Sequence, residues 1–367
     1  MTYGRIPQRL EGLRAQLRDQ VLDGFVLFVT EGSNWEGAYY ISGFRGSSAT
    51  LLITHDEEIL ITDGRYTVQA EEQSRFEVVD QGQRQTLEVL KELLGVRRLR
   101  RVGFEGERVS YALFKKLECI DVKWVDSSSI IPSLRRCKDA LEVSCIRKAA
   151  AFAASALEEA LDSFGPGDAE VKLSALLEFR LRMSGAEGGW KSHEFIVASG
   201  ERSALPHGAP TDRRLMPGEW LTLDYGARYE GYVCDITRNV AAKRRYAWAY
   251  DVHNLLSEAQ KVALEVMKPG VAAKDVDAAA RAVIQRAGFG AYFTHGLGHG
   301  IGLELHEAPR LSPSSDDVLQ EGDVVTVEPG VYVKGRGGLR LEDDYLITAD
   351  GPLCLTEGVP KEFFLIG

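Results

Sequence analysis

The segment from His295 to His306 holds three of the chain's seven histidines, with four glycines between them. Histidine is the commonest metal ligand in proteins, and it titrates near neutral pH. Glycine lets a backbone come close to a site, because it has no side chain to collide. The glycines and the spacings of four and seven residues argue against one regular helix. We interpret the segment as part of a metal or substrate site; the alternative is a surface loop that happens to contain histidines.

The overall charge and the cysteines limit the class of protein. The chain has 44 Lys and Arg against 54 Asp and Glu, a net charge of −10. This balance disfavours nucleic acid and anionic membranes as partners. We expect neither a signal peptide nor a transmembrane helix, because no suitable apolar segment is present. The five cysteines are odd in number and form no CxxC pair, which favours reduced thiols in a cytoplasmic protein.

A length of 367 residues suits two domains. In residues 1–131, short apolar runs alternate with helical periodicity, which predicts an α/β domain with a mixed sheet. The strands are expected at 25–29, 38–41, 49–54, 59–62, 76–79, 102–104 and 122–125. The serine-rich segment 126–132 is interpreted as the linker. Residues 132–367 begin with two predicted helices, one opened by Asp139, and continue with strands and two further helices.

Two acids in the second domain are expected to face each other. Asp224 and Asp235 lie on successive predicted strands, among apolar neighbours. A symmetric turn centred between Tyr229 and Glu230 would make them cross-strand partners, with Cβ atoms roughly 4.5–5.5 Å apart. Two unpaired acids in such a place would repel each other and be costly to bury. A cation between them removes this cost.

Glu328 and Glu342 repeat the arrangement about a glycine-rich turn centred on Gly335. Two hairpins with two carboxylates each, together with the histidine segment, suit a pair of divalent ions bridged by carboxylates and water. Each acid also has an ordinary alternative, as a turn residue or as the partner of Arg238 or Arg340.

Six sequence blocks surround these residues. They are Ala204-Leu-Pro-His-Gly208, Leu223-Asp-Tyr-Gly226, Cys234-Asp-Ile-Thr-Arg238, His295-Gly-Leu-Gly-His-Gly-Ile-Gly302, Glu328-Pro-Gly330 and Arg340-Leu-Glu-Asp343. Together they resemble the signature blocks of proline-specific metallopeptidases, the Xaa-Pro dipeptidases (prolidases) and aminopeptidases P of the pita-bread fold. The resemblance covers about residues 130–367. Residues 1–131 resemble the family's creatinase-like domain more loosely, through Tyr40-Ile-Ser-Gly-Phe-Arg-Gly-Ser47.

The resemblance implies a metal-binding role for five residues. Asp224 would bind one metal, Asp235 and Glu342 would bridge both, and His299 with Glu328 would complete the second site. The family uses manganese or cobalt, sometimes zinc. Four carboxylates with one imidazole favour a hard ion such as manganese.

The resemblance also implies catalytic and substrate-binding residues. A bridging water or hydroxide would attack the scissile carbonyl, and Glu328 would carry its proton to the leaving nitrogen. His207 and His306 would bind the substrate and stabilise the tetrahedral intermediate. His295 and Arg340 would contribute to substrate binding, Arg340 also as a partner of the carboxylates.

Two residues depart from the family pattern. His193 stands where the family usually has phenylalanine, at a position that lines the pocket for the first side chain of the substrate. Arg45 stands in a loop that normally carries a small or uncharged residue. Its guanidinium could pair with the free carboxylate of a dipeptide, which would favour dipeptides over longer chains. The alternatives are a surface histidine and a solvated arginine.

The resulting prediction is a homodimeric, two-metal Xaa-Pro dipeptidase that acts on small peptides with proline in the second position. Aminopeptidase P, which acts on longer Xaa-Pro-Xaa peptides, is the runner-up. A creatinase and a non-catalytic pita-bread binding protein are less favoured, because all five ligand positions are matched. Methionine aminopeptidase activity is disfavoured by the extra N-terminal domain.

Overall fold

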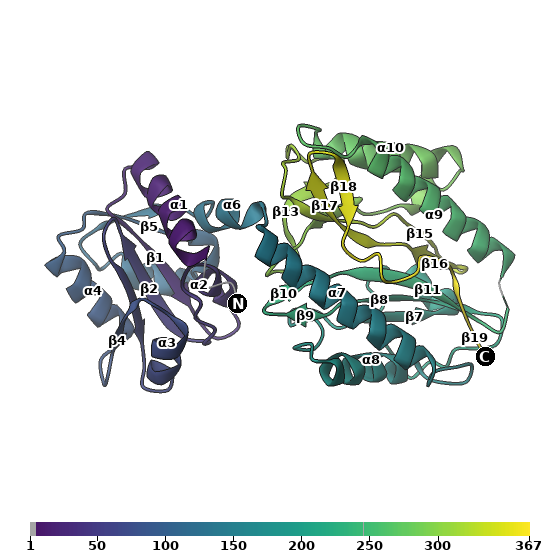
Figure 1. The fold of residues 1–367 in the computed structure, drawn as a ribbon, viewed down its shortest axis with the longest axis horizontal. Helices are drawn as coiled ribbons and strands as arrows, with labels where there is room; N and C mark the ends of the chain where they lie inside the picture. The colour runs from purple at the N-terminus through teal and green to yellow at the C-terminus, as the bar shows by residue number, and fades with distance from the viewer. Residues whose placement is uncertain (1–4, 245) are drawn as a thin grey trace. The chain divides into compact units, whose positions relative to one another are not determined.

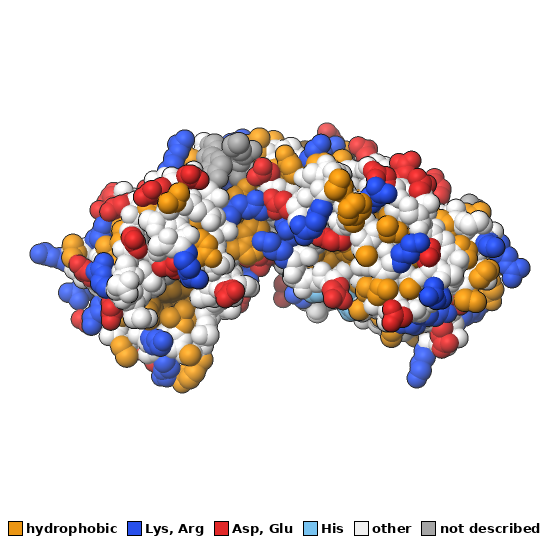
Figure 2. Space-filling view, turned by 90° about the horizontal axis from the view of Figure 1, so that it is seen from below, with side chains coloured by type: hydrophobic (Ala, Val, Ile, Leu, Met, Phe, Trp, Pro, Cys, Tyr) orange, Lys and Arg blue, Asp and Glu red, His pale blue; other side chains and the backbone are white. Residues whose placement is uncertain are grey.

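A computed structural model describes residues 5–244 and 246–367. The chain divides into two compact units, Met1–Arg135 and Arg136–Gly367. On the face drawn in Figure 2, acidic and basic side chains are mixed over each unit, with apolar side chains scattered between them. None of the helices in the described ranges has the length and apolar character needed to cross a bilayer.

The first unit is built on a six-stranded mixed sheet with the order β4-β3-β2-β1-β5-β6. β1 pairs antiparallel with β2, and β2 with β3, while the outer pairs are parallel. The mixed α/β sheet agrees with the sequence prediction. Its elements are α1 (Ile6–Asp19), β1 (Gly24–Val29), α2 (Trp35–Ser42), β2 (Ala49–Thr54), β3 (Glu58–Thr62), α3 (Thr67–Gln73), β4 (Glu77–Asp80), α4 (Thr86–Val96), β5 (Arg101–Phe104), η2 (Gly106–Arg108), α5 (Tyr111–Leu117), β6 (Lys123–Asp126) and α6 (Ile130–Arg136).

The strand predicted at 38–41 is wrong, because these residues belong to helix α2. A short apolar run is ambiguous between a buried strand and a buried helix. Here every residue from Gly37 to Ser42 is buried on the helix. Gly43 ends it in the left-handed conformation, with φ +83°, and donates its N–H to the carbonyl of Tyr39 at 2.8 Å.

The segment interpreted as a linker is structured. It contains the last residue of β6 and the start of α6. Pro132 lies in the first turn of that helix, where its missing N–H has no partner to lose. Ile130 and Ile131 are buried in the core of the first unit, which fixes the segment to that unit. Its serines therefore serve a strand-to-helix turn rather than a free connection.

The second unit places its strands between two pairs of helices, α7 with α8 and α9 with α10 (Figure 1). A four-stranded sheet has the order β19-β11-β8-β7, and a five-stranded sheet the order β13-β12-β14-β17-β18. The elements are α7 (Ala140–Leu161), α8 (Glu170–Ser184), β7 (Ile196–Ser199), η3 (Gly200–Ala204), β8 (Trp220–Tyr225), β9 (Arg228–Tyr229), β10 (Tyr232–Val233), β11 (Ile236–Ala242), α9 (Ala247–Val266), α10 (Ala273–Arg286), η4 (Gly290–Tyr292), β12 (Gly298–Gly300), β13 (Glu307–Leu311), β14 (Val324–Val327), β15 (Gly330–Val333), β16 (Gly337–Arg340), β17 (Asp343–Thr348), β18 (Gly351–Cys354) and β19 (Phe364–Ile366).

Local signals explain the start of α7. Asp139 is the N-cap and accepts the N–H groups of Leu141 at 2.8 Å and Glu142 at 3.0 Å. The Glu142 carboxylate in turn accepts the N–H of Asp139 at 2.8 Å, which completes a capping box. The apolar faces of α9 and α10 pack on the opposite side against strand residues such as Val325 and Leu339. The strands that carry the predicted site are thus enclosed by helices.

Candidate active site

The hairpin that carries Asp224 and Asp235 has a different register from the predicted one. Asp224 pairs with Thr237, two residues beyond the expected partner. The turn is formed by Glu230 and Gly231, both with positive φ (49° and 81°), as in the two-residue turns that suit twisted hairpins. The side-chain period of a strand is two, so a shift of two residues keeps Asp235 on the face of Asp224. The acids are diagonal neighbours rather than directly opposed.

The second pair of acids lies as the sequence predicts. β15 pairs with β16 symmetrically about Gly335, and β14 pairs with β17 in the same continuous register. Glu328 and Glu342 fall opposite each other in the gap between these two ladders. An isolated bridge joins Thr237 to Glu342, and the Thr237 hydroxyl donates to Glu342 Oε2 at 2.6 Å. This bridge brings the two hairpins together.

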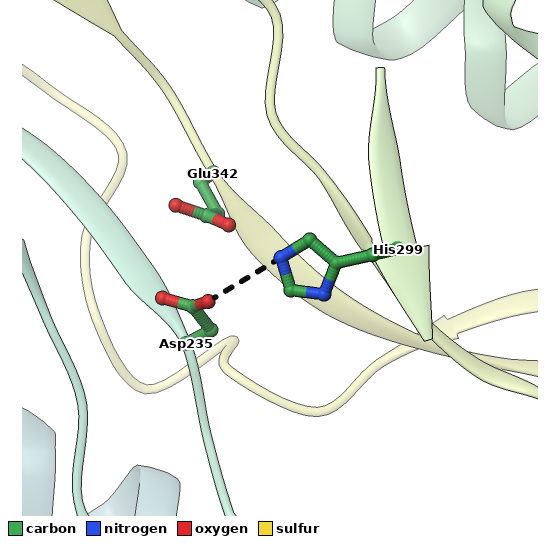
Figure 3. A group of neighbouring side chains, drawn as sticks. All are labelled: Asp235, His299 and Glu342. Atoms are coloured by element: carbon green, nitrogen blue, oxygen red, sulfur yellow. Dashed lines mark ion pairs between the residues drawn. The ribbon is translucent and has the colours of Figure 1, made fainter. Parts of the chain in front are cut away.

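His299 reaches the acids from β12. Its Nδ1 lies 3.0 Å from the carbonyl oxygen of Gly300. A proton on Nδ1 makes this contact a hydrogen bond and leaves Nε2 unprotonated, in the tautomer that a metal requires. Nε2 lies 3.5 Å from Glu328 Oε1 and 3.7 Å from Asp235 Oδ2. The side chains of Asp235, His299 and Glu342 point toward one another (Figure 3), with one ligand atom of each within 4.8 Å of the others.

The protonation tendencies of this cluster fit bound cations. Burial, followed by the charge of Glu342, raises the pKa values of Asp235 and Glu328 well above their usual range. Burial and the charge of Asp224 raise the pKa of Glu342 to about 8. Burial and the neighbouring His306 lower the pKa of His299 to about 3, which keeps its ring neutral.

Two further observations point the same way. Asp224 Oδ1 and Asp235 Oδ1 are buried and have no hydrogen-bond partner among the described residues. Among the described residues, Arg340 is the arginine or lysine paired with these carboxylates. It bonds Asp224 Oδ2, and its Nε lies 3.8 Å from Glu342 and 4.0 Å from Glu328. One guanidinium cannot neutralise four carboxylates, so the side chains fit divalent cations.

Arg340 is held mainly by protein groups. The guanidinium is buried, and it donates to Tyr332 OH at 2.8 Å, Thr237 Oγ1 at 2.9 Å and the carbonyl of Pro206 at 3.1 Å. It also lines the cavity described below. Its contacts make it a support of Asp224, and its predicted contribution to substrate binding stays a prediction.

A cavity of about 800 Å³ opens over the acids. It is lined by all five predicted metal ligands and by the four remaining predicted histidines, His193, His207, His295 and His306. The His306 ring lies 4.3 Å from the His299 ring and 5.5 Å from the His193 ring, both edge-on. His295 Nε2 lies 3.0 Å from Tyr332 OH, and burial, with Arg340, lowers the pKa of His295 to about 4.

Two glycines of the histidine segment are required by the close packing of neighbouring backbone. A Cβ atom at Gly298 would lie 2.1 Å from the carbonyl oxygen of Thr326, and one at Gly300 would lie 2.2 Å from that of Ala308. These glycines are required because neighbouring backbone packs against β12, as in other close backbone approaches. At both positions the missing side chain leaves room for neighbouring backbone, and Gly298 also lines the cavity.

The sequence reasoning missed several supporting residues. Asp344 accepts the N–H of Asp235 at 3.0 Å, and the Arg238 guanidinium donates to the carbonyl of Glu342 at 2.7 Å. Arg238 pairs with Asp343, and both side chains are fully buried. The alternative pairing of Arg238 with Asp235 is therefore wrong. The charged residues of segment 340–344, which lie among apolar neighbours where β16 ends and β17 begins, were the available signal for Asp343 and Asp344.

Two arginines differ in their surroundings. Arg310, on β13, lines the cavity, and its guanidinium forms no ion pair with any described residue. It was not among the predicted site residues. Arg45 lies in the first unit, with its guanidinium 5.0 Å from the centre of the Tyr39 ring. Its proposed contact with substrate stays a prediction.

Both units match known families. Residues 144–349 match metallopeptidase family M24, and residues 9–137 match the creatinase/prolidase N-terminal domain. This match agrees with the enclosed acid and histidine cluster. The chain belongs to metallopeptidase family M24, its second unit has the predicted pita-bread fold, and family membership implies a divalent-metal site.

The relatives cover nearly the whole chain. An Xaa-Pro dipeptidase of Pyrococcus furiosus is 35% identical over 95% of this chain and 98% of its own. The structure of an Xaa-Pro dipeptidase from Bacillus anthracis has a TM-score of 0.92, with 36% identity over 98% of this chain and 100% of that one. An X-Pro aminopeptidase from Thermotoga maritima has a TM-score of 0.89, with 38% identity over 94% and 98% of the two chains. Similarity therefore does not separate the two activities.

Proposed function

We propose that the protein is a two-metal peptidase that cleaves the Xaa-Pro bond of dipeptides. The observation that carries the proposal is a group of four carboxylates, three buried and Glu328 16% exposed, with a neutral His299 beneath a histidine-lined cavity. Two divalent ions, when bound, would supply a water of lowered pKa as the nucleophile and polarise the scissile carbonyl. Asp224, Asp235, His299, Glu328 and Glu342 would hold them, and manganese suits this oxygen-rich set.

The remaining steps belong to side chains of the chain. Glu328 lines the cavity with its side chain 16% exposed, where its carboxylate can take a proton from the attacking water and pass it to the leaving nitrogen of proline. His207 and His306 line the cavity, where each can donate a hydrogen bond to the substrate carbonyl as negative charge develops. His295 is held against Tyr332 beside them and completes the substrate side.

The preference for a dipeptide is supported by Arg310. Its guanidinium lines the cavity without an acidic partner among the described residues. A free carboxylate is the group that a guanidinium binds best, through two parallel hydrogen bonds. A dipeptide places that carboxylate on the proline itself, whereas a longer peptide places an amide there. Arg45 could serve the same purpose, and the substitution Arg45→Ser tests it by the same measurement of length selectivity.

The first side chain of the substrate would meet a polar wall. His193 lines the cavity edge-on to His306, and its Nδ1 lies 2.9 Å from the Ser192 hydroxyl. We therefore propose that the P1 pocket accepts polar side chains more readily than a pocket lined by phenylalanine. A homodimer and a cytoplasmic location remain predictions from the family resemblance and the cysteines.

The decisive experiment compares Xaa-Pro with Xaa-Pro-Xaa substrates after chelation and again after addition of manganese. We expect hydrolysis only with added metal, and a higher kcat/KM for the dipeptide. Faster hydrolysis of the tripeptide would assign the chain to aminopeptidase P, the runner-up. Activity that survives complete removal of metal would reject the mechanism altogether.

A further inference from the structure

His207 lies in a loop, residues 200–211, that we call the His207 loop. The imidazole makes no hydrogen bond to any described residue and is exposed to the cavity. Its ring is therefore not held by a partner of its own. The position of the ring must come from the backbone of the loop that carries it, so the anchors of that loop decide where the histidine stands.

Glu170, the first residue of α8, anchors both ends of the His207 loop. Its side chain is only 1% exposed. Oε1 accepts the N–H of Ser199 at 2.8 Å and its hydroxyl at 2.7 Å. Oε2 accepts the N–H of Thr211 at 3.0 Å, its hydroxyl at 2.8 Å, and the Arg202 guanidinium. One buried carboxylate thus ties together the residues just before, within and at the end of the loop.

The anchor extends to the neighbourhood of His207 itself. Arg202, held by Glu170, donates a second hydrogen bond to the carbonyl of Ala209 at 2.8 Å. From the other side, Arg340 donates to the carbonyl of Pro206 at 3.1 Å. The backbone is therefore fixed directly before His207 by the metal-site arginine and two residues after it by the Glu170–Arg202 pair.

We propose that Glu170 is a positioning residue, which sets His207 against the substrate through the His207 loop. This inference rests on the proposed function, in which His207 contacts the substrate. Both oxygens of Glu170 act only as acceptors, for five donors in all. A glutamine has the same shape but only one acceptor oxygen, so its NH₂ group would face donors and leave them unpaired.

The test is Glu170→Gln in the manganese-loaded protein. We expect kcat/KM for an Xaa-Pro dipeptide to fall by about 10- to 100-fold, the range that follows from a displaced catalytic group. The manganese content should not change, because Glu170 contacts no metal ligand. Added to His207→Ala, the same substitution should cost less than about twofold, because both changes then act through one side chain.

The matched control is Asp323→Asn. Asp323 is also a buried carboxylate that accepts an arginine, Arg136, and a backbone N–H, that of Gln320, but it does not line the cavity. It should lower thermal stability while leaving kcat/KM within about twofold. A full 10-fold loss from Glu170→Gln in the His207→Ala background, or an equal activity loss in the control, would overturn the positioning role.

A readout without activity separates this inference from the proposed function. Amide hydrogen exchange should rise in residues 200–211 of Glu170→Gln and stay unchanged there in Asp323→Asn. Arg202→Gln, which removes one of the five donors, should give a smaller change in the same direction and covers the case in which Glu170→Gln does not fold. If the wild type cleaves no Xaa-Pro bond, the proposed function fails while exchange still tests the anchor. Unchanged exchange and unchanged kcat/KM would refute it.

Discussion

The acids of this site and the histidines proposed to bind substrate are held in place by different means. Asp224, Asp235, Glu328 and Glu342 take their places from the main-chain register of two hairpins. His207 and His306 lie outside regular strands and depend on side-chain anchors. Glu170 fixes the first, and the buried pair of Lys138 with Glu307, 3.0 Å apart, fixes the turn that carries the second. The predicted metal positions are thus built by local pairing, and the predicted substrate positions by contacts distant in sequence.

The largest expected effect is that of Asp235→Asn, a substitution among the four acids that the strand register positions. The loss of one bridging carboxylate should lower manganese binding and reduce kcat/KM by at least about 10³-fold, the upper end of the effect of one lost oxyanion donor. Manganese content by atomic spectroscopy and hydrolysis of an Xaa-Pro dipeptide measure both effects. Retained activity at full manganese content would contradict the assignment of Asp235.

The substitution His306→Ala tests one of the two histidines that side-chain contacts hold in place. It should reduce kcat/KM by about 10²-fold, because one hydrogen bond to the developing charge is lost. Manganese content should match that of the wild type, which distinguishes this loss from that of Asp235→Asn. If His306→Ala released the metal as well, the division into a metal region and a substrate region would be wrong.

The packing of β12 can be tested by Gly298→Ala. The added Cβ would lie 2.1 Å from a backbone oxygen, so we expect a loss of about 1–3 kcal/mol in the free energy of unfolding, as for other overpacked sites. The control is Gly95→Ala in α4, where nothing lies within 4 Å and a helix gains up to about 1 kcal/mol. Denaturant unfolding of both variants measures the difference. Equal stabilities would show that β12 does not need its glycines.

The acids and the histidines of the site titrate in opposite directions in the metal-free protein. Glu342 has a pKa raised to about 8, so its stabilising protonated state is lost as pH rises toward that value. His295 and His299 have pKa values lowered to about 4 and 3. They therefore destabilise the folded protein only below pH ~6.5, their usual pKa. Between pH 6.5 and 8, of these two groups only the acids change the stability with pH. The Tm of the chelated protein should therefore fall as pH rises. Manganese should abolish this slope; a flat profile after chelation would count against the raised pKa values.

These two regions differ in how far the sequence predicts them. The pairing of Glu328 with Glu342 followed from a glycine-marked turn, and the structure has that register. The pairing of Asp224 was two residues out, because nothing in the sequence required Glu230 to adopt a positive φ. The two acids were still predicted on the correct face of the hairpin, because strand side chains repeat every two residues.

The anchors could not be predicted from the sequence. Glu170 lies 29 residues from Ser199, and Lys138 lies 169 residues from Glu307. Such contacts follow from the tertiary fold, and a charged residue in the sequence is more often exposed than buried with several donors. The same holds for Arg310, whose cavity-facing position depends on the pairing of β12 with β13.

The smallest expected effect concerns substrate length. Arg310→Gln keeps a long polar side chain but removes the charge that would bind a free carboxylate. We expect the ratio of kcat/KM for a dipeptide to that for the matching tripeptide to fall by about tenfold, equivalent to about 1.4 kcal/mol. Arg286→Gln, on α10 and away from the cavity, is the control and should leave the ratio unchanged. Since only the carboxylate of the dipeptide gains from the guanidinium, the tripeptide rate should stay nearly constant. A parallel loss for both substrates would instead make Arg310 a general support of the cavity, and the dipeptide preference would then depend on Arg45.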